Sequence, residues 1–158
     1  MKRSFVMVVS VVLTLVLTTA GAVADCPQAT TQECVAKCQE AIAYAKEHGT
    51  AALFEKINQE DGPFAWKGTY VFCVEDKTAK MLAHPLPFFQ GMIGRSLLPI
   101  RDPDGREVWK RIMEDVQFGR CWGVYLFSPA PGKDPRVKVS YFEKVPDTNV
   151  IVAAGITP

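Results

Sequence analysis

Histidine is scarce in this sequence of 158 residues, which contains only His48 and His84. The short motifs that mark common catalytic sites are also missing, since there is no nucleophile elbow, no H-E-x-x-H and no phosphate loop. The C-x-x-C-H motif that attaches haem covalently does not occur either. A cysteine nucleophile would depend on one of the two histidines as its partner. We therefore expect a binding protein without a cofactor rather than an enzyme.

A strong positive charge is absent as well. The whole chain has a net charge of +1, and residues 1–24 contribute Lys2 and Arg3 as their only charged residues. Without that segment the net charge is therefore −1. Because no basic field is available to attract phosphate groups, we expect no nucleic-acid partner.

Long apolar runs are missing after the N-terminus. The chain starts with Met1, Lys2 and Arg3, followed by an apolar run at 5–17 and by an A-x-A site that ends at Ala24. This pattern is typical of a secretory signal peptide, and the run is shorter than the roughly 20 residues that span a bilayer. We expect a signal peptide at 1–24 and one domain at 25–158, periplasmic or secreted. The alternative is an uncleaved segment that tethers the protein to the inner membrane.

All five cysteines follow the predicted signal peptide. Some of them should pair in an oxidising compartment, and because five is an odd number, at least one stays free or pairs between chains. Cys34 and Cys38 are one helical turn apart, and Cys26 is near enough in sequence to fold back onto either. A metal site at these three residues lacks a good fourth ligand. We therefore expect a disulfide that involves Cys26 and either Cys34 or Cys38.

Two helices are predicted before the first strand. Thr30 and Glu33 form a capping box that begins a helix near residue 31, and Gly49 has the position of a C-terminal glycine that ends it. Thr50 is expected to cap a shorter second helix that runs to about residue 57.

Short strands and turns dominate the rest of the chain. Residues 69–75 are largely apolar at both alternating sets of positions, which indicates a central strand covered on both faces. The expected strands are 69–75, 80–83, 120–128, 136–144 and 149–156, with an amphipathic helix at 107–118 between the second and the third. This order predicts an α+β fold in which helices pack on an antiparallel sheet.

Several short segments carry a further signal when they are taken in order. They are 68–72 with Asp76, 82–85, 91–94, 102–105, Gly119 with Trp122 and Tyr125, 138–141, and 154–156. In order and spacing they resemble the single Cache domain family of type 2, a PAS-like extracytoplasmic sensor domain of bacterial chemoreceptors and free periplasmic proteins. The similarity covers roughly residues 35–156.

The resemblance implies a PAS-like five-stranded antiparallel sheet with a long N-terminal helix along one face and a connecting helix. It also implies an extracytoplasmic pocket for a small molecule, often a short organic acid. Family members usually have two flanking membrane helices, and the second is not seen here. We therefore expect a free-standing sensor that feeds signal transduction or chemotaxis through a membrane receptor or kinase partner. Members often pair through the N-terminal helix, so a homodimer is one of the open alternatives.

Six residues are candidates for the ligand site, namely His84, Arg120, Trp122, Tyr125, Lys138 and Tyr141. His84 precedes a proline after a strand, either as a donor at the pocket rim or as a turn histidine that satisfies backbone groups. Trp122 and Tyr125 have opposite parity on one strand. One of them should therefore line the pocket while the other packs under a helix.

Lys138 and Tyr141 also differ in parity along their strand. The family resemblance favours Lys138 as the partner of a ligand carboxylate, and the alternative is a surface lysine with a half-buried stem. Arg120 and Arg95 are further candidates, because arginine binds carboxylates in bidentate fashion.

The odd number of cysteines supports a different function from a sensor. A thiol that remains unpaired would make the chain a periplasmic redox or protein-interaction module. The reactivity and burial of Cys73 and Cys121 distinguish this alternative from a structural role.

Overall fold

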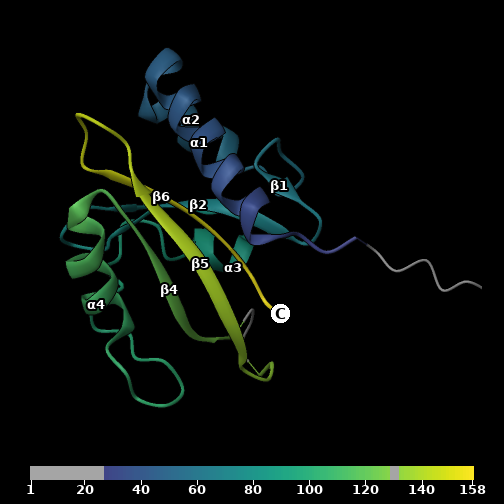
Figure 1. Ribbon diagram of the computed structural model, residues 1–158, viewed down its shortest axis with the longest axis vertical. Coiled ribbons are helices and arrows are strands. Elements are labelled where there is room, and N and C mark those ends of the chain that lie inside the picture. The colour runs from purple at the N-terminus through teal and green to yellow at the C-terminus, as the bar shows by residue number, and fades with distance from the viewer. Residues whose placement is uncertain (1–26, 129–131) are drawn as a thin grey trace, which may run out of the picture.

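The first two helices lie where the sequence predicts them. The computed structural model, which describes residues 27–128 and 132–158 (Figure 1), has helix α1 at Thr31–His48 and α2 at Thr50–Ile57. The Thr30 hydroxyl accepts a hydrogen bond from the Glu33 backbone N–H, and the Glu33 carboxylate accepts one from the Thr30 backbone N–H. This reciprocal capping box fixes the start of α1. Gly49, at a φ of 86°, separates the two helices, so Thr50 is the first residue of α2 rather than its cap.

The strands form one antiparallel sheet. They are β1 Ala65–Trp66, β2 Thr69–Glu75, β3 Met81–Ala83, β4 Arg120–Phe127, β5 Arg136–Lys144 and β6 Val150–Ile156. Their order across the sheet is β1-β2-β6-β5-β4, and β3 also pairs with β2. The α+β class and all five expected strands are confirmed.

The short strand β1 is the sixth strand, where five were expected. It pairs with the start of β2 across a two-residue turn at Lys67 and Gly68, and both turn residues have positive φ. Such left-handed turns match the twist of antiparallel strands, but Lys-Gly is a weaker sequence signal than Asn-Gly. The extra hairpin was therefore missed from the sequence.

The remaining helices follow the first hairpins of the sheet. Helix α3 spans Pro87–Gln90, and α4 spans Val108–Asp115 and continues as the 3-10 turn η1 at Val116–Phe118. The predicted helix at 107–118 thus ends in a tighter turn. Gly119, at a φ of 103°, then allows the sharp entry into β4.

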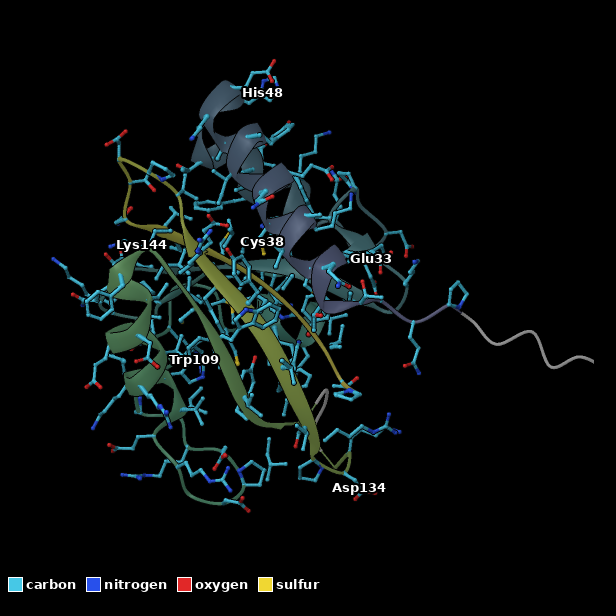
Figure 2. All side chains as sticks on the ribbon, in the orientation of Figure 1. Glu33, Cys38, His48, Trp109, Asp134 and Lys144 are labelled. Atoms are coloured by element: carbon cyan, nitrogen blue, oxygen red, sulfur yellow. The ribbon has the colours of Figure 1, made fainter. Side chains whose placement is uncertain are left out.

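The two faces of the sheet have different covers (Figure 1). Helices α1 and α2 pack on the side that we call the helix face, which carries Val71, Cys73, Tyr141 and Val152. The opposite side, which we call the cavity face, is covered by α4 and the connection at 84–107, and it carries Tyr70, Phe72, Tyr125 and Phe142. Figure 2 labels Cys38 on α1 and Trp109 on α4, one on each side of the sheet.

The expected signal peptide at 1–24 and Cys26 lie outside the described residues, so their interpretation stays a prediction. Within 27–128 and 132–158, no helix combines the length and the apolar character that crossing a membrane requires.

Candidate ligand-binding cavity

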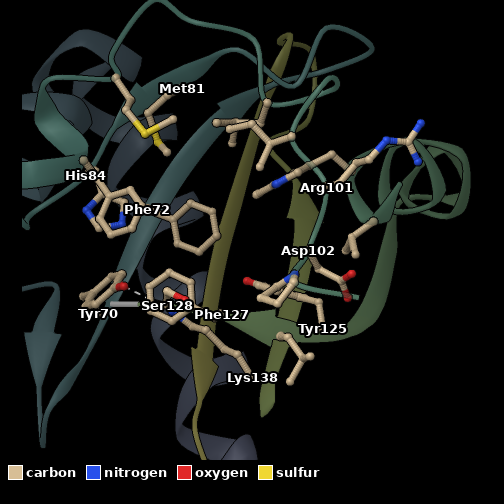
Figure 3. A pocket seen from close by; sticks show the side chains of 18 residues that line it. Tyr70, Phe72, Met81, His84, Arg101, Asp102, Tyr125, Phe127, Ser128 and Lys138 are labelled. Atoms are coloured by element: carbon tan, nitrogen blue, oxygen red, sulfur yellow. Dashed lines mark hydrogen bonds between the residues drawn. The ribbon is translucent and has the colours of Figure 1, made fainter. Parts of the chain in front are cut away.

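A cavity of about 340 Å³ lies between the cavity face and its cover (Figure 3). Its volume is within the usual range of small-molecule sites, roughly 300 to 1,000 Å³. Strands β2, β4 and β5 contribute Tyr70, Phe72, Tyr125, Phe127 and Lys138, while the cover contributes His84, Phe89, Leu97 and Trp109. The lining is therefore mostly aromatic and apolar, with a few polar groups.

Strand alternation decides which side chains reach the cavity. On β5, Lys138, Ser140 and Phe142 are two residues apart and point to the cavity face. Tyr125 on β4 is the register partner of Lys138, so the two side chains stand next to each other on the same face.

Lys138 is the charged group at the centre of the polar end of the cavity. Its side chain is 4% exposed, and no described carboxylate lies within ion-pair distance of it. The ammonium donates a hydrogen bond of 3.1 Å to the Tyr70 hydroxyl and stands 4.5 and 4.3 Å from the ring centroids of Tyr70 and Phe127. Burial lowers the pKa of Lys138 to about 8, so the amine is still largely protonated at neutral pH.

His84 adds a neutral donor to the same end. Its Nδ1 accepts a hydrogen bond of 3.1 Å from the Leu86 backbone N–H, so the neutral ring carries its hydrogen on Nε2. Burial, assisted by the charge of Lys138, lowers the pKa of His84 to about 3. The imidazole therefore stays uncharged at any physiological pH, and its ring packs 4.7 Å from that of Tyr70 and 4.5 Å from that of Phe89.

The tyrosine hydroxyls are the other polar groups of the cavity. Tyr125 shares a hydrogen bond of 3.0 Å with the Ser140 hydroxyl. Burial raises the pKa of Tyr125 to about 12 and raises that of Tyr70 as well. Both phenols therefore keep their protons, and neither supplies the negative charge that Lys138 lacks.

Arg101 and Asp102 line the cavity and make contacts within the cover, although the buried Asp102 Oδ2 has no hydrogen-bond partner among the described residues. The exposed Arg101 guanidinium donates hydrogen bonds to the Gly105 carbonyl and to the Glu107 carboxylate, and Figure 3 shows it directed away from Lys138. The Asp102 Oδ1 accepts hydrogen bonds from the backbone N–H groups of Asp104 and Arg106. These contacts hold the turn that the sequence predicted at 102–105, and they leave Lys138 as the cation that faces the interior.

A surface groove of about 1140 Å³ adjoins the polar end of the cavity. Tyr70, Phe127 and Lys138 line both hollows, so these three side chains form the wall between them. The ammonium group therefore lies one side-chain layer below the surface. This position gives a small ligand a short route to Lys138.

The structure brings together three of the six predicted site residues, His84, Tyr125 and Lys138. Trp122 is on the helix face, 44% exposed, with its ring 5.1 Å from that of Tyr141. Trp122 is not buried under a helix because α1 packs mainly on β6 and β5, which leaves the helix face of the edge strand β4 uncovered.

Tyr141 and Arg120 also lie away from the cavity, so the structure does not bring them together with Lys138. The Tyr141 hydroxyl donates to the Glu143 carboxylate on the helix-face side, and Arg120 is exposed at the start of β4. Arg95, the other arginine candidate, is exposed on the cover. In each case strand parity or exposure directs the side chain elsewhere.

Four cavity residues were missed from the sequence, namely Tyr70, Phe72, Phe127 and Trp109. Tyr70 and Phe72 belong to one alternating set of 69–75, and this parity was a usable signal for a shared face. Phe127 has the same parity as Tyr125, so it was accessible by the same rule.

Three of the four described cysteines, Cys34, Cys38 and Cys73, are buried, and Cys121 is partly exposed. Among the described residues, Cys34, Cys38, Cys73 and Cys121 form no disulfide with one another. Burial raises the pKa of Cys34 to about 11 and raises those of Cys38 and Cys73 further. Because the thiolate is the reactive form, this environment does not favour the redox alternative. In the described part of the chain, no cluster of three ligating side chains is suited to a metal ion.

Comparisons with known proteins give matches only at the level of structure. No protein-family model and no curated protein sequence matches the chain. A periplasmic sensor domain of a chemotaxis protein matches with a TM-score of 0.62 and 18% identity, over 80% of this chain and 88% of that one. A Cache chemosensory domain, described for its carboxylic acid recognition, matches with a TM-score of 0.61 and 20% identity, over 80% and 86%.

A methyl-accepting chemotaxis protein from Vibrio parahaemolyticus matches with a TM-score of 0.60 and 15% identity, over 80% of this chain and 86% of that chain. The antiparallel sheet, the long N-terminal helix and the cavity beneath the cover are thus those of an α+β sensor-domain fold. Within that class, the fold of this chain is the Cache fold, as its sequence resemblance implied. Two of these solved structures are named as a periplasmic sensor domain and as a chemosensory domain.

Proposed function

We propose that this chain is an extracytoplasmic sensor domain whose cavity binds a small organic acid through Lys138. The supporting observation is the buried ammonium group, which has hydroxyl and aromatic neighbours but no described carboxylate partner. Removing an ion from water costs several kcal/mol unless an opposite charge compensates it. A ligand carboxylate supplies that charge, so binding relieves a cost that the empty site carries.

The neighbouring donors fit the same ligand. The Tyr70 hydroxyl already accepts from Lys138, so its own hydrogen is free to donate to a carboxylate oxygen. The Nε2 hydrogen of His84 is a second neutral donor, since Nδ1 is engaged by the backbone. Charge-assisted hydrogen bonds of this kind are stronger than neutral ones.

The fold and the N-terminal sequence support a cellular location and a signalling role for this site. One solved structure with this fold is named for carboxylic acid recognition, a second as the periplasmic sensor domain of a chemotaxis protein, and a third as a methyl-accepting chemotaxis protein. Together with the predicted signal peptide, these likenesses support a periplasmic location. In this proposal the liganded domain signals through a membrane receptor or a kinase partner, and pairing through α1 is one route to that contact.

Calorimetric titration of propionate against propionamide tests the proposal, because the two probes differ in charge but little in shape. The acid should bind at least tenfold more tightly than the amide. Lys138→Met should remove that difference, whereas Lys110→Met, which changes an exposed lysine of α4, should keep it. A saturating acid at about a hundredfold its Kd should add roughly 2.7 kcal/mol to the free energy of unfolding. Equal binding of acid and amide by the wild-type protein would contradict the proposal.

A further inference from the structure

The cavity has two chemically different ends. The polar end contains Lys138, Tyr70 and His84. Tyr70 contacts both of the others, through a hydrogen bond from Lys138 and through ring packing with His84. The lining away from Lys138 is mainly apolar, with Met81, Leu97, Ile100, Val108 and Trp109, and it also includes Arg101 and Asp102 of the cover. Figure 3 shows Lys138 and Met81 at opposite ends of the labelled side chains. A ligand bound at Lys138 therefore extends toward an apolar surface.

The volume of the cavity is too large for a carboxylate group with only a methyl or ethyl tail. A water molecule takes roughly 30 Å³ in the liquid, so 340 Å³ is the space of about ten waters. A two- or three-carbon acid at Lys138 leaves the apolar end occupied by water or empty. Water there lacks the two to four polar partners that stabilise a buried molecule, so a tail that fills this end is favoured.

The rings around the apolar end favour an aromatic tail. The Phe72 ring stands at the centre of edge-to-face contacts, with centroid distances of 6.5 Å to Trp109 and 6.1 Å to Phe142 and interplanar angles of 80° and 88°. Trp109 also contacts Tyr125 at 6.4 Å. A flat ring packed against these side chains gains the directional ring contacts that an aliphatic tail of equal area does not make.

The charges of the cavity limit the ligand to one carboxylate. Among the described lining residues, the second cation is Arg101, whose guanidinium is exposed and bound to Glu107. A second carboxylate at the far end would lie against Met81, Leu97 and Trp109 without a counter-charge. Burying an unpaired ion is strongly unfavourable, so a dicarboxylate is excluded from the apolar end.

We infer that the site takes an aryl-substituted short-chain monocarboxylate, with its carboxylate at Lys138 and its ring packed against Phe72 and Trp109. This inference rests on the proposed function, because it assumes that Lys138 binds the acid group. The inference also specifies the tail of the ligand. The side chains that select this tail are separate from Lys138, which binds the carboxylate.

Calorimetry with phenylacetate, cyclohexylacetate, acetate and succinate tests the tail. Phenylacetate should bind at least tenfold more tightly than acetate or succinate, and several-fold more tightly than cyclohexylacetate. Val108→Phe, which fills the apolar end from the half-buried first residue of α4, should weaken phenylacetate at least tenfold and leave acetate within threefold. Ile93→Phe enlarges an exposed side chain of the cover and should change neither affinity.

A second measurement needs no variant. Nuclear Overhauser contacts between the ring protons of phenylacetate and the Trp109 indole should appear in the wild-type protein and vanish when the ligand is displaced. Acetate or succinate binding as tightly as phenylacetate, or a ring without contact to Trp109, would overturn the inference and leave the acid site at Lys138 standing. Absence of binding by all four acids, or phenylacetate binding unaffected by Lys138→Met, would overturn the proposed function itself.

Discussion

The two faces of the sheet use the same strands for different purposes. The helix face is packed largely with buried aliphatic and small side chains, such as Leu53, Val152 and Ala154. The cavity face carries rings and buried polar groups, such as Phe72, Tyr125 and Lys138, around an open volume. Dense packing stabilises the fold, whereas the second face keeps an unpaired charge and empty space, both of which reduce stability. The contrast indicates that the helix face compensates for the cost of the binding site.

The largest expected effect tests whether the helix face supplies the stability. Leu53 on α2 is fully buried, so Leu53→Ala should lower the free energy of unfolding by about 2 to 5 kcal/mol. Urea denaturation followed by circular dichroism measures the change. Val124→Ala, at a position on β4 that is 64% exposed, is the control and should stay within about 0.5 kcal/mol. Similar losses in both variants would show that burial beneath the helices is not the source of the stability.

The next effect concerns the charge on the cavity face. The lowered pKa of Lys138, from 10.5 to about 8, corresponds to a cost of charging on the order of 3 kcal/mol in the empty protein. Below pH 8 this cost is fully present, and it is relieved as the pH rises to 10.5, because only the unfolded chain then binds the proton. Lys138→Met should therefore stabilise the empty protein at pH 7.

The pH dependence of stability distinguishes the effect of the Lys138 charge from the effect of replacing the side chain. Denaturation of wild-type protein and Lys138→Met at several pH values should give a stability difference that shrinks between pH 8 and 10.5. Lys110→Met, on the exposed side of α4, should show no such trend. A Lys138→Met variant that is less stable than wild type at pH 7 would show that the ammonium is compensated in the empty protein.

The smallest expected effect is an absence of reaction at the buried thiols. Cys34, Cys38 and Cys73 are fully buried and have raised pKa values, so iodoacetamide at pH 7.5 should modify none of them in the folded protein. Mass spectrometry should find all three modified after unfolding in urea under reducing conditions. Rapid modification of Cys73 in the native state would instead support the thiol-based alternative.

Local signals in the sequence predicted much of the fold. The capping box at Thr30 and Glu33 located the start of α1, and the doubly apolar run at 69–75 identified a central strand, which became β2 between β6 and the short strands β1 and β3. Hydrogen bonds and burial within a few residues determine these features, so they are visible along the chain. The β1 hairpin was not predicted because its first turn residue, Lys67, adopts a positive φ, and asparagine or glycine is the usual sequence signal for that conformation.

The site was only partly predictable, because parity shows which residues share a face but does not show what covers it. Parity correctly separated Tyr125 from Trp122 and Lys138 from Tyr141. It could not show that α1 leaves β4 bare, since strand order is a tertiary property. The contribution of Leu97 and Trp109 depends on how the connection at 84–107 folds over the sheet, and no period in the sequence encodes that path.

The alternation along β5 has an evolutionary consequence. Positions 138, 140 and 142 point to the cavity face, where Lys138 lines the cavity, while Tyr141 between them packs with the helix side. Substitutions at the first set can change the lining of the cavity while selection for folding acts on the second. A lineage of such chains can therefore diversify its chemistry by point mutation. A single-residue insertion in the strand would exchange the two sets and lose both properties at once.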